Sequence, residues 1–124
     1  MTRRATPAGA VIITTPHTLA VKDAIKGINM FRTLNVPLLG LVQNMSLYTC
    51  PSCSSTHHIF GAADRALKIC ADQAIDFLGD VPLDPSIGDS VEEGKPVVVA
   101  EPTGKVAGIY ADFAKQIATK IGLS

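Results

Sequence analysis

Residues 10–14 are Ala10-Val11-Ile12-Ile13-Thr14, a short run in which β-branched apolar side chains follow one another without polar alternation. Such a run is typical of a strand that is covered on both faces within a parallel sheet. The same pattern returns at Leu38-Leu39-Gly40-Leu41-Val42, directly after Pro37. Two strands of this kind, joined by a segment long enough for a helix, predict a parallel βαβ unit.

Helical patterns surround these strands. Apolar side chains recur at helical spacing from Thr18, the expected N-cap, to Leu34. Further along, we expect a helix over 62–74, a short strand near 77–79, another strand at 97–99 and a C-terminal helix over 106–121 that closes at Gly122. The predicted fold class is α/β, with a mostly parallel sheet that places ligands at the carboxyl ends of its strands. The cysteine-bearing segment 43–60 and the loop at Pro82 both follow strands, so we expect both at that edge.

The composition excludes several classes of function. Eleven basic and eleven acidic side chains cancel, which leaves no charge pattern for gathering nucleic acid or anionic lipid. No apolar run approaches the roughly 20 residues that a transmembrane helix requires. The opening residues lack a secretory apolar core and an import helix, so no targeting signal is recognised in this chain, and residues 1–8 are expected to be disordered.

The cysteines carry the clearest chemical signal. Three cysteines are too few for a disulfide framework, so Cys50-Pro51-Ser52-Cys53 is interpreted as a reduced metal or redox pair. A tight turn can direct both sulfurs at one metal, but zinc and four-iron clusters each require about four ligands. Cys70 lies on the apolar stripe of a predicted helix and is interpreted as a small hydrophobic residue.

Two completions of this half-site stay open from spacing alone. In one, His57 or His58 joins the cysteines in a structural zinc knuckle within one chain. In the other, a two-fold axis brings two cysteine pairs around one cluster between subunits. A thioredoxin-like exchange site is the least favoured reading, because no helix is predicted to begin at the cysteines.

One segment resembles a phosphate-binding loop without matching it. Between Gly88 and Gly94 there are five residues where that loop has four, and Pro96 stands where a magnesium-binding hydroxyl is needed. Asp84, Asp89, Glu92 and Glu93 in and around this segment are expected to serve solvation and the capping of a helix or turn.

Several motifs in order resemble the C-terminal half of the Mrp/nucleotide-binding-protein-like (NUBPL-type) P-loop family. They are Gly9 to Pro16, Lys26-Gly27, Met30-Phe31-Arg32, Pro37 to Gly40, Gln43-Asn44-Met45-Ser46, Cys50-Pro51-Ser52-Cys53, His58 to Gly61, Leu78 to Leu83 and Gly94-Lys95-Pro96. The resemblance covers nearly everything after residue 8, so 9–124 is expected to be part of such a domain, with its cysteine loop at 44–60. The details around Asn44 and His58 resemble most the mitochondrial branch that serves respiratory complex I assembly.

The resemblance implies a homodimer that binds ATP and holds a four-iron, four-sulfur (4Fe-4S) cluster for transfer to recipient apoproteins, in the mitochondrial matrix or alternatively the cytoplasm. Carried over by position, Cys50 and Cys53 would bind the cluster, and Asn44 and Pro82 would border the adenine. Thr15 and Pro16 would lie near the nucleotide and the dimer face.

The chain departs from the family in one large respect, because the glycine-rich lysine loop, the magnesium ligands and the switch segments are not in this sequence. Phosphoryl transfer then lacks its electrostatic support, so we expect no ATP hydrolysis and at most weak nucleotide binding by this chain alone. The sheet should also have an unpaired edge with apolar faces. An alternative function is therefore a P-loop-less ATPase subunit that a P-loop-bearing chain completes in trans.

Overall fold

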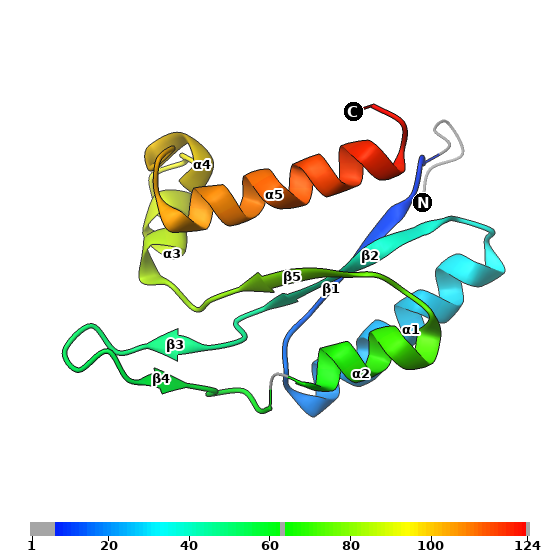
Figure 1. Cartoon of the computed structure of the whole chain (residues 1–124), viewed down its shortest axis with the longest axis horizontal. Coiled ribbons are helices and arrows are strands. Elements are labelled where there is room, and N and C mark those ends of the chain that lie inside the picture. Colours follow the sequence, from blue (N-terminus) through cyan, green and yellow to red (C-terminus); the bar gives the residue numbers. More distant parts are fainter. Residues whose placement is uncertain (1–6, 63, 124) are drawn as a thin grey trace.

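A computed structural model describes residues 7–62 and 64–123 of the chain (Figure 1). Its centre is a parallel sheet of β1 (Ala10–Thr14), β2 (Leu38–Asn44) and β5 (Phe77–Val81), in the order β1-β2-β5. Thr14 is in register with Gln43, and Asn44 with Val81, so the three strands end together. This confirms the predicted α/β fold and the strands expected at residues 10–14, 38–42 and 77–79. Residues 1–6 of the segment expected to be disordered lie outside the described residues.

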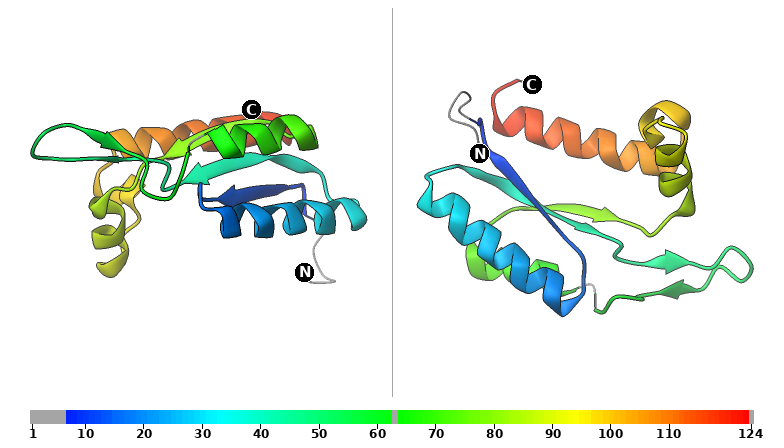
Figure 2. Two further views of the ribbon diagram at one scale, coloured as in Figure 1. Left: turned by 90° about the horizontal axis from the view of Figure 1, so that it is seen from below. Right: turned by 180° about the vertical axis from the view of Figure 1, so that it is seen from behind.

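Two layers of helices cover the sheet (Figure 2). Helices α1 (Thr18–Thr33) and α2 (Asp64–Gln73) pack on one face and bury Ile12, Ile28 and Leu41 in a common cluster. Helix α5 (Lys105–Lys120) packs on the other face, where Phe113 meets side chains of β2 and β5. Alternate residues of each strand therefore face two different cores, as expected of strands covered on both sides.

Gly79 allows α5 to lie close to the sheet. Its φ is +148°, and an added Cβ would lie only 2.8 Å from Cε1 of Phe113. A larger residue would both strain the backbone and displace the Phe113 ring.

Two expectations about local structure were wrong. The run Val97-Val98-Val99 is part of a short helix, α4 (Val97–Ala100), and not a strand. Pro96 is the N-cap of α4, Val97 is buried, and α4 packs against α5. These tertiary contacts override the β propensity of valine. The N-cap of α1 is His17 and not Thr18, because Nδ1 of His17 accepts a hydrogen bond from the backbone N–H of Leu19 at 3.1 Å.

The acidic segment contains a helix, α3 (Pro85–Glu92). Asp84 is its N-cap and accepts a hydrogen bond from the backbone N–H of Ser86 at 2.9 Å. The expected capping role of this segment is therefore confirmed for Asp84. A proline in the first turn is pre-organised for this helix start.

The β1 edge of the sheet has no strand beside it among the described residues, where β1 pairs with β2 alone. Ile12 faces α1 and α2, so its neighbour Ile13 points toward the opposite, α5 face of the sheet. Helix α5 packs on β5 and not on β1, which leaves Ile13 66% exposed. Leu19 and Met30 on α1, and Leu34 directly after it, are also half or more exposed. This is the unpaired apolar edge that the sequence predicts. No described helix is long and apolar enough to cross a membrane.

Candidate functional site

The cysteine pair lies at the tip of a β-hairpin that projects beyond the carboxyl ends of the parallel strands (Figure 1). The segment predicted to be an irregular loop thus contains two short strands, β3 (Tyr48–Thr49) and β4 (Thr56–His57), which pair antiparallel. The backbone N–H of Cys50 donates to the carbonyl of Ser55 at 2.8 Å, and the N–H of Ser54 donates to the carbonyl of Cys50 at 2.8 Å. These bonds close a tight turn around both thiols, so the expected turn is present.

The hairpin also sets the ionisation of its second thiol. Cys53 is exposed, and hydrogen bonds from the Ser55 side chain and backbone, followed by one from Cys50, lower the pKa of the Cys53 thiol. Hydrogen bonds to a charged group favour the charged form, and the thiolate is the form that binds metal. Cys50 is half-buried and also belongs to this turn. The turn is therefore suited to present two sulfur ligands toward solvent.

No single-chain metal site forms in the part of the chain that the structure describes, where no three His, Cys, Asp or Glu side chains are grouped to hold a metal. Nδ1 of His58 lies 3.1 Å from the carbonyl oxygen of Ser46, at the base of the hairpin, and His57 lies in the strand opposite Tyr48. The geometry therefore gives no support to the zinc knuckle, and it leaves two sulfurs that need ligands from elsewhere.

The third cysteine behaves as the sequence indicates. Cys70 is buried in the cluster between α1, α2 and the sheet. Burial raises the pKa of its thiol, with a smaller contribution from Asp76. A buried thiol that resists ionisation is a poor metal ligand.

Asn44 and Pro82 line the same cavity, of about 460 Å³, at the carboxyl edge of the sheet. Asn44 ends β2, and its Oδ1 accepts a hydrogen bond from the backbone N–H of Met45 at 2.9 Å. Tyr48, Leu83 and other side chains complete the lining. The volume lies within the range of about 300–1,000 Å³ that small-molecule sites occupy. A planar amide beside a proline and apolar side chains is a chemically suitable setting for a purine ring.

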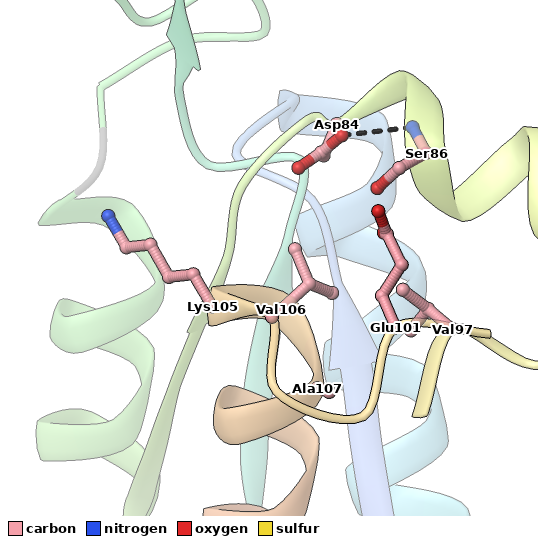
Figure 3. Close-up of a pocket in the computed structure, with 8 residues that line it drawn as sticks. Asp84, Ser86, Val97, Glu101, Lys105, Val106 and Ala107 are labelled. Carbon is pink, nitrogen blue, oxygen red and sulfur yellow. Dashed lines mark hydrogen bonds between the residues drawn. The ribbon is translucent and has the colours of Figure 1, made fainter. Parts of the chain in front are cut away.

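Two further hollows share lining residues with this cavity. One, of about 430 Å³, is lined by Tyr48 and Pro51 from the hairpin, by Pro82 and by Lys105 from α5. The other, of about 290 Å³, lies between the start of α3 and the start of α5 (Figure 3). The Ser86 hydroxyl and the Glu101 carboxylate point toward each other there. Because Pro51 belongs to the cysteine turn, the cysteines and the Asn44 cavity share one edge of the molecule.

Thr15 and Pro16 follow β1 at the same end of the sheet, but neither lines these cavities. Oγ1 of Thr15 accepts a hydrogen bond from the N–H of His17 at 3.3 Å. Pro16 is fully buried, and its carbonyl accepts a hydrogen bond from Arg65 at 2.9 Å. The structure thus brings Asn44 and Pro82 together and leaves Thr15 and Pro16 as a separate group.

Sequence reasoning missed Tyr48, Asp84 and Lys105 as residues that line these hollows. Tyr48 sits in a segment without periodicity, so its position depends on a hairpin that the sequence did not predict. Lys105 begins α5, and only the fold places this helix start beside the loop that follows β5. Only Asp84 had a signal in the sequence. It lies two residues after Pro82, in the loop that follows the strand predicted near 77–79, where ligands are expected.

A family model described as ParA: NUBPL iron-transfer P-loop NTPase matches residues 1–118 of the chain. Among curated proteins, the chain is 47% identical over 113 residues to the iron-sulfur cluster transfer protein NUBPL of Mus musculus, a match that covers 91% of this chain and 35% of the mouse protein. It is 42% identical over 109 residues to an Arabidopsis thaliana iron-sulfur protein required for NADH dehydrogenase, mitochondrial, covering 88% of this chain and 34% of that protein. The chain therefore spans about a third of the length of these relatives.

Solved structures share the fold. A nucleotide-binding protein from Archaeoglobus fulgidus in complex with ADP matches with a TM-score of 0.65 and 29% identity, over 82% of this chain and 40% of that chain. The cell division ATPase MinD of Pyrococcus furiosus matches with a TM-score of 0.70 over 90% of this chain and 43% of that chain. At 22% identity, the second match bears on the fold alone.

Proposed function

The chain belongs to the NUBPL iron-transfer P-loop NTPase family, and from this premise we propose that it binds an iron–sulfur cluster through Cys50 and Cys53 and passes it to recipient apoproteins. The observation that carries the proposal is the exposed hairpin turn, which presents two thiols and lowers the pKa of one of them. The cluster is cargo in this function, so the ligands must hold it without enclosing it. A solvent-facing turn at the end of a hairpin satisfies that requirement.

The finer proposal is a 4Fe-4S cluster shared by a homodimer through the cysteine turns. One chain offers two sulfurs and, among its described residues, no third ligand grouped with them. A two-fold axis supplies the missing pair, because the same surface meets itself and gives four thiolates around one cluster.

Reconstitution with iron and sulfide under argon tests this proposal. We expect about two iron atoms per chain, as a four-iron cluster shared by two chains requires, together with a dimer in native mass spectrometry. Cys50→Ser or Cys53→Ser should abolish cluster binding, whereas Cys70→Ala is the matched control and should keep it. Full retention of the cluster in both serine variants would overturn the proposal. A colourless protein with one zinc ion per monomer would favour the zinc alternative instead.

For the nucleotide, we propose that the cavity between Asn44 and Pro82 accepts the adenine ring of ATP. Support comes from the two residues sharing one cavity and from the ADP complex of a 29% identical relative. Binding should be weak in this chain, since no P-loop sequence is present to hold the phosphates. The measurement is calorimetric titration with ATP, and Asn44→Ala should weaken the binding further, whereas the exposed substitution Asn29→Ala on α1 should leave it unchanged.

A P-loop-bearing unit should complete the sheet at β1. The unpaired edge of β1, the exposed Ile13 and the apolar flank of α1 support this proposal, as does a chain that spans about a third of its relatives. A parallel strand added at this edge would satisfy the backbone groups of β1 and bury the apolar side chains. Thr15 and Pro16 would then lie beside that unit, near the nucleotide phosphates and the dimer face.

The recipients that we propose are apoproteins of respiratory complex I in the mitochondrial matrix. The support is the sequence resemblance to the complex I branch and a relative described as required for NADH dehydrogenase. A cytoplasmic carrier is the alternative. Incubating the cluster-loaded chain with purified complex I apoproteins, and following cluster transfer by circular dichroism, tests the recipient class.

A further inference from the structure

Arg65, in the first turn of α2, links three segments that are distant in sequence. Its Nη1 donates one hydrogen bond to the carbonyl of Pro16 at 2.9 Å and one to Oγ1 of Thr18 at 3.1 Å. Gly61, where the chain leaves the hairpin, lies beside the Arg65 guanidinium and the Pro16 carbonyl. A Cβ added at Gly61 would lie 2.8 Å from Nη1 of Arg65 and 3.2 Å from the Pro16 carbonyl oxygen. The loop after β1, the exit of the hairpin and the start of α2 therefore meet at one guanidinium.

The hairpin is held at its base by two anchors. On the entry side, the backbone N–H of Ser46 donates to the carbonyl of Val81 at 3.2 Å and the N–H of Leu83 donates to the carbonyl of Leu47 at 2.8 Å, so the hairpin is tied to β5 and the loop after it. Nδ1 of His58, 3.1 Å from the carbonyl oxygen of the buried Ser46, joins the two sides of the hairpin there. On the exit side, Gly61 has a φ of +127° and leaves no room for a side chain between the backbone and Arg65. The cysteine turn lies between these anchors and is exposed except at Cys50, which is half-buried. Its position relative to the sheet thus depends on these two points.

The chemistry of the exit anchor favours arginine. A guanidinium stays charged at any physiological pH and presents several donors in a planar fork, so one group can serve two acceptors. Hydrogen bonds from a charged donor are stronger than those from a neutral one. Both bonds come from one nitrogen, Nη1. Lysine would keep the charge, but its Nζ ends one bond short of the position of Nη1.

We propose that Arg65 is a positioning residue that couples the loop at Thr15–Pro16 to the cysteine hairpin. A shift of that loop moves the Pro16 carbonyl, and Arg65 transmits the shift to the hairpin exit and so to Cys50 and Cys53. The consequence for cargo rests on the proposed function, because it requires that the two cysteines hold a cluster. The link between the loop and the hairpin does not require a bound cluster, so it can be tested separately from the proposed function.

Hydrogen–deuterium exchange on the metal-free chain tests the link. Arg65→Ala should accelerate exchange across residues 45–61 by about fivefold or more, as the loss of a charged hydrogen bond implies, and Arg65→Lys should give an intermediate increase. The matched control is Arg32→Ala, since Nη1 of Arg32 also joins α1 to α2, through Gln73 Oε1 at 2.9 Å, but at the far end of these helices. It should leave the hairpin unchanged, and both variants should retain the circular dichroism of the native chain.

A second perturbation, at the second acceptor of Arg65, separates coupling from a general loss of structure. Thr18→Val removes one acceptor of Arg65 and should accelerate hairpin exchange in the native background, yet add nothing in the Arg65→Ala background. Equal hairpin exchange in the Arg65→Ala and Arg32→Ala chains, or a Thr18→Val effect of the same size in both backgrounds, would overturn the proposal. If the exchange pattern is as expected but no chain binds a cluster, the coupling stands and the proposed cargo is wrong.

Discussion

Replacing Ile13 by lysine tests whether the β1 edge is an assembly surface. In this chain 66% of the Ile13 side chain is exposed, so Ile13→Lys should change the free energy of unfolding by no more than about 0.5 kcal/mol. Full burial of an isoleucine contributes about 1.5–3 kcal/mol. The exposed two-thirds would therefore contribute about 1–2 kcal/mol when a P-loop-bearing unit covers it. Losing that contribution weakens binding by about fivefold to thirtyfold.

The assay is a titration of the chain with a separately purified P-loop-bearing region of a full-length family member, followed by calorimetry. The control is Leu67→Lys on α2, whose side chain is 50% exposed but whose helix packs over β2 and β5, away from the β1 edge. We expect the control to bind as the native chain does. Equal affinity of Ile13→Lys and Leu67→Lys would refute the reasoning, because the exposed apolar surface of β1 would then contribute nothing to assembly.

Three further predictions concern the thiols and the core. Ser55→Ala removes the hydrogen bond that most lowers the pKa of Cys53, so that pKa should rise toward its ordinary value and the pH profile of Cys53 alkylation by iodoacetamide should move to higher pH. Gly40→Ala places a Cβ 2.5 Å from Cγ of Leu78 and should lower the free energy of unfolding in urea by about 1–3 kcal/mol. Its control, Gly108→Ala on α5, has nothing within 4 Å of the added Cβ and should raise the free energy of unfolding by about 0.5–1 kcal/mol. Cys70→Ala should cost about 1 kcal/mol of stability without reducing the iron bound; loss of iron in this variant would contradict its assignment as a purely apolar residue.

The three buried strands and the long helices could be predicted from sequence because their side-chain pattern is set by burial on both faces. Ile12 faces one core while Val11 borders the other, so no polar residue interrupts the run. At residues 97–99 the same reasoning predicted a strand, and the structure has a helix there. Three consecutive valines favour a strand in isolation, but Pro96 begins a helical turn there, and the packing of α4 on α5 decides the outcome. That contact joins elements whose arrangement the local sequence does not encode.

The candidate site also has parts that the local sequence predicts and parts that depend on the fold. The cysteine pair was predictable because two thiols at close spacing have a chemical meaning without any fold. The common cavity of Asn44 and Pro82 follows from parallel strands that end together, with Asn44 in register with Val81. The hairpin strands were not predictable, since β3 and β4 have only two residues each and no alternation that a pattern could reveal. Arg65 was missed for a different reason, because its acceptors are 47 and 49 residues away in the chain.

A carrier must hold its cargo firmly enough to transport it and loosely enough to release it, and the hairpin suggests how one fold meets both needs. Cys53 is exposed and Cys50 is half-buried, on a turn that two backbone hydrogen bonds close. What fixes the turn is its base, at Ser46 and at Gly61 beside Arg65. If the cysteines hold a cluster as proposed, substitutions at the base should change the rate of cluster release more than the number of clusters bound.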